Sequence, residues 1–203
     1  MNADMVKLSD FIKRFKLAFP SYNGTAWDIP PSIDDILREK IKSLPAEYRI
    51  KGDAAIHKSA RIEEHTILKG TMIIGPGCFI GAHAYIRGGV FMDDGAVVGP
   101  GCEVKTTMIF KQSVLAHFNF VGDSIIGQGV NMEEGSVIAN HYNERTDKTI
   151  HVVIKDIKTP LNIEKFGALI GDNCRIGANS VLSPGTVLEP RAVVKRLELV
   201  EQG

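Results

Sequence analysis

Residues 73–102 decide the fold, and they read IIGPGCFIGAHAYIRGGVFMDDGAVVGPGC. A large apolar residue occupies every sixth position, and a second, mostly smaller residue follows it four positions later. The large anchors are Ile74, Ile80, Ile86, Met92 and Val98, and the residues four positions on are Cys78, Ala84, Val90, Ala96 and Cys102. A helix cannot keep a six-residue period on one face, whereas a short strand followed by a tight turn can.

The period extends outward from this stretch, back to Ile56 and on to Phe110, and it resumes from Ile170 to Val194. Three repeat units make one coil, and successive coils stack at about 4.8 Å. This pattern is typical of the hexapeptide parallel β-helix. We therefore predict an all-β solenoid over residues 51–203. The repeat does not determine the hand, but known proteins with this repeat coil left-handed, and we expect a left-handed parallel β-helix.

The repeat is interrupted between its two regular stretches. Two of the steps between the anchors that follow Phe110 are one residue shorter than the period. Residues 140–166 then lose the period, and they include the polar run 143–148. We expect an extended loop here that leaves the coil and returns near Phe166. A loop of this length in a compact domain is usually functional or disordered.

Residues 1–50 do not repeat, and their apolar spacing predicts a small helical segment. One short helix would follow Ser9, and a second would follow Pro30–Pro31 and end before Pro45. Ser32 and Asp35 resemble a capping box at the start of the second helix. We predict that this segment packs on the first coil and caps the open sheet edge of the solenoid.

The overall charge excludes several classes of partner. The 203 residues contain 24 Lys and Arg against 24 Asp and Glu, so the formal net charge is zero. No basic field is available to hold a nucleic acid or an anionic membrane surface. No apolar run approaches the roughly 18 residues that a membrane span requires, and the first residues do not resemble a signal peptide. We expect a cytoplasmic protein with no membrane span.

The cysteines and two of the histidines have simple explanations. Cys78, Cys102 and Cys174 all occupy the inward position of the repeat, and an odd count argues against a disulfide framework or a structural zinc site. We predict buried thiols. His65 and His83 are three repeat units apart at turn positions, but zinc needs at least three protein ligands and no third is evident. We expect surface histidines and no metal.

Two cations are predicted to stack on one outer face of the coil. Arg87 and Lys105 each follow an apolar anchor, and they are separated by the length of one full coil. Like charges at that spacing repel, so a negative group should lie beside them. Glu103 lies on the same strand face as Lys105. Two interpretations remain open: a solvated face that Glu103 neutralises, or a site for a phosphate, which suits convergent cations.

His117 follows in the irregular stretch, and histidine is the usual general base near neutral pH. A general base needs an orienting partner, and Glu103 could reach it from the adjacent coil. A single histidine is nevertheless more often structural. Asn131 and Asn140 can donate and accept hydrogen bonds to sugar hydroxyls or amides.

Several motifs together resemble a known family. They are GCEVK at 101–105, AHFNFVGDSIIGQGVN at 116–131, VIAN at 137–140, FGALIG at 166–171 and LSPG at 182–185. They are similar to the acetyltransferase half of the bifunctional sugar-1-phosphate nucleotidylyltransferase / glucosamine-1-phosphate N-acetyltransferases, most of all the archaeal type. The resemblance covers roughly residues 26–200. The segment before the repeat is too short to contain the nucleotidylyltransferase domain.

The resemblance implies roles for individual residues. His117 falls on the catalytic histidine and Glu103 on the acid that orients it. The positions that fall on sugar-phosphate or sugar contacts are Arg87, Lys105, Asn131 and Asn140. Two departures concern the chemistry: Phe120 replaces a tyrosine and so lacks its hydroxyl, and Glu133-Glu134 replaces small residues beside the expected thioester.

The resemblance also implies an acetyl-CoA co-substrate, no metal and a homotrimer. A backbone N–H of Gly135 or Ser136 could receive the thioester oxyanion. The small residues Gly177 and Ala178 would admit the pantetheine arm against the 140–166 loop. Lys195 and Arg196 would meet CoA phosphates, although a solvated pair of charges explains them equally well.

We therefore predict an acetyl-CoA-dependent N-acetyltransferase acting on an amino-sugar 1-phosphate such as glucosamine 1-phosphate. A separate nucleotidylyltransferase could work alongside it. One alternative is a non-catalytic module that binds sugar phosphates or sugar nucleotides. Another is a lipid-A-precursor-type acyltransferase that uses acyl carrier protein. A gamma-class carbonic anhydrase is disfavoured, because a third histidine ligand is missing.

Overall fold

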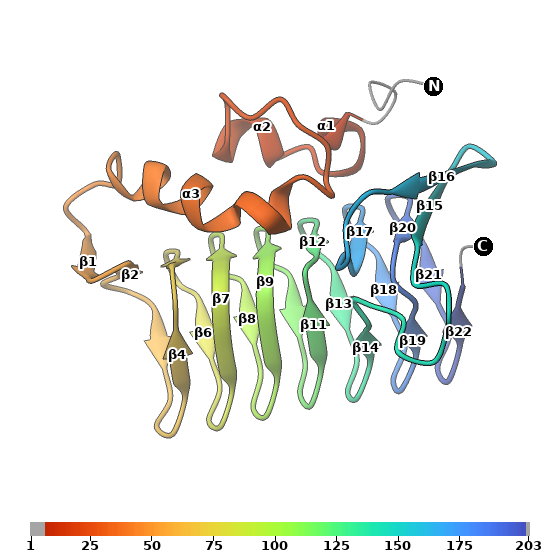
Figure 1. Ribbon diagram of the computed structural model, residues 1–203. Coiled ribbons are helices and arrows are strands. Elements are labelled where there is room, and N and C mark those ends of the chain that lie inside the picture. The colour runs from red at the N-terminus through yellow and green to blue at the C-terminus, as the bar shows by residue number, and fades with distance from the viewer. Residues whose placement is uncertain (1–6, 202–203) are drawn as a thin grey trace.

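A computed structural model describes residues 7–201. The chain winds into a left-handed β-solenoid of about 8 turns, with short helices along one side of it (Figure 1). The predicted all-β parallel β-helix is thus confirmed. Within residues 7–201, no helix combines the length and the apolar character that crossing a membrane demands.

The coil has three faces. Face 1 is formed by β4 (Ile67–Lys69), β7 (Tyr85–Met92), β9 (Glu103–Ile109), β11 (Phe120–Gly122), β14 (Val137–Ile138), β19 (Val181–Leu182) and β22 (Leu199–Val200). Face 2 is formed by β2 (Ala54–His57), β5 (Met72–Ile74), β12 (Ile125–Ile126), β17 (Ala168–Ile170), β20 (Thr186–Leu188) and the second halves of β7 and β9. Face 3 is formed by β3 (Arg61–Ile62), β6 (Phe79–Ile80), β8 (Val97–Val98), β10 (Val114–Leu115), β13 (Asn131–Met132), β18 (Arg175–Ile176) and β21 (Val193–Val194).

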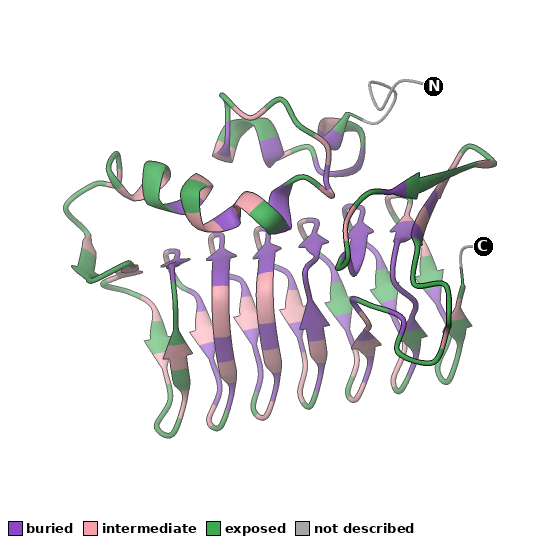
Figure 2. Ribbon diagram, in the orientation of Figure 1, coloured by how far each residue is buried: buried purple, intermediate pink, exposed green. Residues whose placement is uncertain are grey.

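The large anchors of the repeat form one continuous core, and most of the coil is buried in Figure 2. Phe110 is an exception to the predicted pattern: Ile109 takes the inward position, and Phe110 packs outside the coil against Phe15 of the N-terminal segment. Ile74, Ile80 and Ile86, for example, are completely buried. The three cysteines belong to the same core and are all free, as predicted. Burial in this apolar interior raises the pKa of the Cys78 thiol to about 12.

The shorter steps in the sequence correspond to shortened coils. The ladder partners Arg87 and Lys105 are three full repeat units apart in the sequence. The ladder partners Val90 and Thr107 are closer in the sequence by one residue. The coil that follows keeps this shorter length, since Glu103 lies opposite Phe120. One residue is therefore lost at the corner between face 1 and face 2, and the coils on either side remain in register.

Each coil turns from face 3 to face 1 through a residue with a left-handed backbone conformation. These residues have φ between 54° and 67°, and they are His65, His83, Gly101, Phe118, Gly135, Asn179 and Leu197. We call this edge of the solenoid the His117 corner. From Gly101 onward, the N–H of each left-handed residue donates to a carbonyl in the preceding coil. The acceptor is the residue just before the left-handed residue of that coil, so these preceding residues stack in one column. That column is Ala82, Pro100, His117, Glu134, Ala178 and Arg196.

The N-terminal helices lie along the side of the coil instead of over its end (Figure 1). They are α1 (Leu8–Phe11), α2 (Phe15–Ala18) and α3 (Ile29–Ile41). Their apolar side chains pack on outward residues of face 2 such as Ile73, Phe91 and Met108. The sheet edge is covered by β1 (Tyr48–Lys51), which pairs antiparallel with β2. The helices therefore lie along several coils of face 2, while the end of the same segment covers the open sheet edge.

The start of the longest helix also differs from the expectation. α3 begins at Ile29, so Pro30 and Pro31 lie within its first turn, where a missing N–H costs little. Ser32 is inside the helix, and its hydroxyl donates to the Asp28 carbonyl at 2.6 Å. The proposed capping box therefore does not form.

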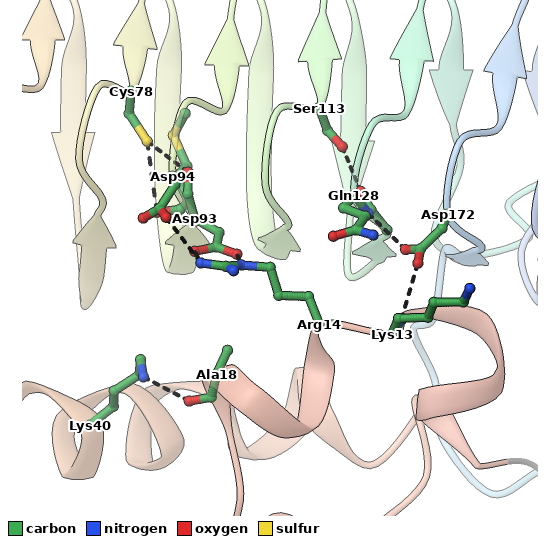
Figure 3. Close-up of polar contacts among 12 residues, drawn as sticks. Lys13, Arg14, Ala18, Lys40, Cys78, Asp93, Asp94, Ser113, Gln128 and Asp172 are labelled. Atoms are coloured by element: carbon green, nitrogen blue, oxygen red, sulfur yellow. Dashed lines mark hydrogen bonds and ion pairs between the residues drawn. The ribbon is translucent and has the colours of Figure 1, made fainter.

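Polar contacts join the N-terminal segment to turns of the coil (Figure 3). The Arg14 guanidinium binds Asp93, and it also donates to Asp94 at 3.0 Å. Asp172 accepts the Lys13 amide at 3.1 Å, and its own N–H donates to the Phe11 carbonyl at 2.9 Å. These contacts fix the segment on coils that are far apart in the sequence.

The predicted 140–166 loop does leave the coil, but it carries a β-hairpin of its own. The strands are β15 (Ile150–Ile154) and β16 (Ile157–Leu161), and the turn residues Lys155 and Asp156 both have positive φ. This hairpin was not expected from the sequence, because two-residue hairpin turns usually contain Asn-Gly or Asp-Gly and this turn contains neither. The base of the excursion is closed, since the Phe166 amide donates to the Asn140 carbonyl at 3.0 Å.

Candidate functional site

The two predicted cations do stack on face 1. Arg87 in β7 and Lys105 in β9 are direct partners in the parallel ladder. Glu103 accepts a hydrogen bond from Arg87 Nε at 2.7 Å, which supplies the expected negative group. The Arg87 and Glu103 side chains remain about one-third exposed, so this pair is open to solvent and to a ligand.

Lys105 has a carboxylate partner of its own, which the sequence analysis missed. Lys105 Nζ donates to Oδ1 and Oδ2 of Asp123 at 3.1 and 2.8 Å. The same carboxylate accepts from the Asn140 amide, and Asn140 Oδ1 lies 3.1 Å from His141 Nδ1. The repeat gave no signal for this pair, because Asp123 is one residue beyond Gly122, the ladder partner of Lys105. Lys105, Asp123, Asn140 and His141 thus form a continuous polar network that joins face 1 to the excursion.

Gly122 makes room for this network. It lies opposite Lys105 in the ladder, and a Cβ at this position would be 2.8 Å from Asn140 Nδ2. Two residues earlier, Phe120 lies opposite Glu103 and is half-buried on the same outward row. The polar network therefore has an aromatic neighbour on the same face.

His117 is held by a different acid from the one expected. Its Nε2 lies 2.9 Å from Oε2 of Glu134, its neighbour one coil later in the column of the His117 corner. Glu103 is instead bound to Arg87, because it lies within a strand of face 1 whereas His117 lies in the turn before that face. The expected Glu103–His117 pair is thus corrected within the described residues. The Phe118 ring stands edge-on to the imidazole, with centroids 5.8 Å apart.

A shallow groove of about 520 Å³ lies on face 3, next to the His117 corner. It is lined by three cations and one carboxylate, together with small and apolar residues. The charged residues are Arg175, Lys195, Arg196 and Glu133. Gly177 also lines it, so three of the six residues predicted to contact the cofactor gather here. Arg175 was not foreseen, although it precedes the anchor Ile176 and therefore points outward.

Glu133 closes one end of this groove. Its carboxylate accepts from Arg196 Nε and Nη2 at 2.7 and 2.9 Å, and from the Ala178 amide at 2.9 Å. The hydrogen bond from Arg196 is the main cause that lowers the pKa of Glu133 to about 2. The carboxylate is therefore ionised throughout the neutral range.

Comparison with known proteins identifies what the chain resembles. The hexapeptide repeat of succinyl-transferases matches residues 72–104 and 167–195. Over 185 residues the chain is 31% identical to a bifunctional sugar-1-phosphate nucleotidylyltransferase/acetyltransferase of Sulfurisphaera tokodaii, covering 85% of this chain and 45% of that protein. The bifunctional protein GlmU of Methanococcus vannielii is 28% identical over 183 residues, covering 88% and 44%. The chain is therefore similar to part of these bifunctional proteins, and it carries the hexapeptide repeat.

A solved structure supports the fold. A Bacillus cereus protein described as an acetyltransferase superposes with a TM-score of 0.54 at 19% identity, covering 69% of this chain and 71% of the other. The chain spans less than half the length of the two bifunctional relatives.

Three residues of the predicted site lie away from the positions expected. Asn131 is on face 3 and lines the groove, so it does not join Asn140 on face 1. Gly135 donates its N–H to the His117 carbonyl at 3.1 Å, so this amide is used within the coil. Ser136 is completely buried, and its hydroxyl donates to the Glu133 carbonyl at 2.9 Å.

The remaining histidine pair is stacked on the His117 corner. The rings of His65 and His83 are nearly parallel, with centroids 5.3 Å apart. Among residues 7–201 there is no group of three side chains that could hold a metal ion.

Proposed function

We propose that this chain transfers an acetyl group from acetyl-CoA to the amine of an amino-sugar 1-phosphate. The observation that carries the proposal is the position of His117. It lies on the corner that joins face 1, which carries Arg87 and Lys105, to face 3, which carries the cationic groove. An acceptor on one face and a donor on the other would therefore meet at one imidazole.

Face 1 suits a phosphorylated acceptor. Arg87 offers a planar fork of donors and Lys105 a compact ammonium, and both groups bind phosphate. A phosphate must compete with Glu103 and Asp123, so it would bind beside existing ion pairs and not to free cations. Asn140 and His141 would supply hydrogen bonds to sugar hydroxyls at the end of the same network.

Face 3 suits the phosphates of an acyl-CoA. Arg175, Lys195 and Arg196 line the groove against the single carboxylate of Glu133, which leaves an excess of positive charge. Such a groove attracts a polyanionic donor and orients it along the strands. The acyl end would then lie toward the His117 corner.

The reaction we propose needs one proton shuttle. The imidazole of His117 accepts a proton from the acceptor amine while the nitrogen attacks the thioester carbonyl carbon. The new C–N bond forms, the C–S bond breaks, and the departing thiolate takes the proton from the imidazolium. General-base catalysis of this kind contributes typically about 10²–10⁴-fold. No covalent enzyme intermediate is required.

We also propose a homotrimer. Several apolar side chains of faces 1 and 3 point outward and stay exposed near the C-terminal coils, among them Val181, Val193 and Leu199. A second copy packed against these faces would cover them. Light scattering that gives a monomer at micromolar concentration would contradict this assembly.

The decisive experiment measures CoA release with acetyl-CoA and glucosamine 1-phosphate. The wild type should turn over, and His117→Ala should lose about 10²–10⁴-fold in kcat. His57→Ala is a matched control, since His57 lies in β2 at the opposite end of the solenoid. Equal rates for wild type and His117→Ala would overturn the catalytic assignment.

A second candidate is a sugar-phosphate binding module without turnover. One observation favours it: Glu133 already occupies the Ala178 amide and Arg196, two groups predicted to contact the donor. Calorimetry should then show glucosamine 1-phosphate binding while acetyl-CoA produces no heat and no CoA is released. Binding of both ligands would exclude this candidate.

A further inference from the structure

Two adjacent carboxylates of the His117 corner reach in opposite directions along the solenoid. Glu133 reaches forward to Ala178 in the following coil and to Arg196 in the coil after that. Glu134 reaches back to His117 in the preceding coil. Neither contact was expected from the sequence, and the two have different explanations.

The contact of Glu133 has an internal counterpart in an earlier coil. Glu63 occupies the equivalent turn position, because Glu63 and Glu133 each directly follow a face 3 strand. The N–H of each also donates to the carbonyl of the face 3 anchor in the next coil. Glu63 accepts the Ala82 amide at 2.9 Å, the same distance as from Glu133 to the Ala178 amide. This bond is therefore a structural feature that joins consecutive coils.

The contact of Glu134 has no such structural purpose. Its side chain is 60% exposed and that of His117 is 42% exposed. A pair with this much solvent around it contributes little to the stability of a fold. The backbone of the two turns is already joined without it, since the Gly135 amide donates to the His117 carbonyl. The pair mainly restricts the orientation of the imidazole.

The chemistry of the pair assigns the proton on the ring. An ionised carboxylate can only accept, so the nitrogen that faces Glu134 must carry hydrogen. That nitrogen is Nε2, and its distance to Oε2 is 2.9 Å. In the neutral imidazole the free lone pair is then on Nδ1.

We propose that Glu134 is the positioning residue for His117, that it holds the ring as the Nε2–H tautomer, and that Nδ1 is the basic atom. This inference rests on the proposed acetyl transfer for its functional meaning. Besides Glu134, the charged groups of this corner in the coils near the ring are Glu133 and Arg196, which bind each other.

The experiment is ¹⁵N NMR of histidine-labelled protein, with the His117 signals assigned by their absence in His117→Ala. In the wild type we expect the neutral ring to be protonated at Nε2. Glu134→Ala should remove the tautomer preference and lower kcat by about 10-fold to 100-fold, part of what general-base catalysis supplies. Glu134→Gln retains an acceptor, so it should keep the tautomer and most of kcat.

A matched control is Glu64→Ala. Glu64 directly follows Glu63, as Glu134 follows Glu133, so it occupies the equivalent turn position in an earlier coil. Its removal should change neither the tautomer nor kcat. A wild-type ring protonated at Nδ1, or a tautomer ratio unchanged in Glu134→Ala, would overturn the inference. Because the NMR result needs no turnover, an inactive protein with the expected tautomer would refute the proposed function alone.

Discussion

Lys105 donates to both carboxylate oxygens of Asp123, and the two side chains are only 19% and 7% exposed. This ion pair connects a strand of face 1 to the corner where the excursion leaves the coil, because Asp123 also accepts from Asn140. The pair therefore stabilises the fold, in addition to its proposed role beside a phosphate.

Replacing Asp123 should cost more stability than a surface substitution. Asp123→Ala leaves the Lys105 ammonium largely buried without its partner, which destabilises proteins by about 3–5 kcal/mol. Urea denaturation followed by circular dichroism measures the loss. Asp147→Ala is the control, because Asp147 is exposed on the excursion. Equal midpoints for the two variants would contradict the burial of the pair.

Arg87 should act on the phosphorylated acceptor alone. A lost charge-assisted hydrogen bond is worth about 1.5–3 kcal/mol, so Arg87→Ala should raise KM for glucosamine 1-phosphate by about 10-fold to 100-fold. The KM for acetyl-CoA should not change, because the groove lies on face 3. A parallel rise in both constants would indicate general damage to the coil.

The Glu133–Arg196 pair should make stability depend on pH at the acidic end. Hydrogen bonding to Arg196 lowers the pKa of Glu133 to about 2, below the value of about 4.3 in an unfolded chain. Because the folded pKa is the lower one, the contribution is complete above about pH 5 and is lost as the pH falls toward 2. In Tm measurements, Glu133→Gln should fall below the wild type at neutral pH and converge with it in acid. A constant difference across this range would contradict the assignment.

The N-terminal segment should loosen when its ionic contact with the coil is removed. Arg14→Ala deletes the bonds to Asp93 and Asp94, and Asp93 is nearly buried. Hydrogen bonds to charged groups contribute about 1.5–3 kcal/mol, so limited proteolysis within residues 7–28 should accelerate. Arg38→Ala is the matched control, since its pairs with Asp35 and Asp53 are well exposed. Similar cleavage of both variants would show that Arg14 does not hold the segment.

The three cysteines should resist thiol reagents in the folded protein. Burial raises the pKa of Cys78 to about 12 and that of Cys174 to about 11, and it raises that of Cys102 as well. Since the thiolate is the reactive form, labelling should follow the rate of unfolding. Mass spectrometry after a short pulse should find no adduct in buffer and three in denaturant. Rapid labelling of any one cysteine would show that its coil opens locally.

The sequence alone was sufficient for the solenoid, since the six-residue period records which side chains must point inward in every coil. The same period placed Arg87 opposite Lys105, because residues one coil apart meet in a parallel ladder. It could not find Asp123 or Glu134, whose side chains lie in turns outside the anchor pattern. The direction in which a turn side chain reaches depends on the local backbone and on its neighbours in three dimensions.

Residue order by itself determined the coil, its buried thiols and the row of cations on one face. Only the tertiary structure decided that Glu103 binds Arg87, that Glu134 binds His117, and that the N-terminal helices lie along face 2. The physical reason is that a repeat specifies burial, which is the same in every coil. Pairing between charged side chains depends on distances across corners and between distant segments, which the repeat does not encode.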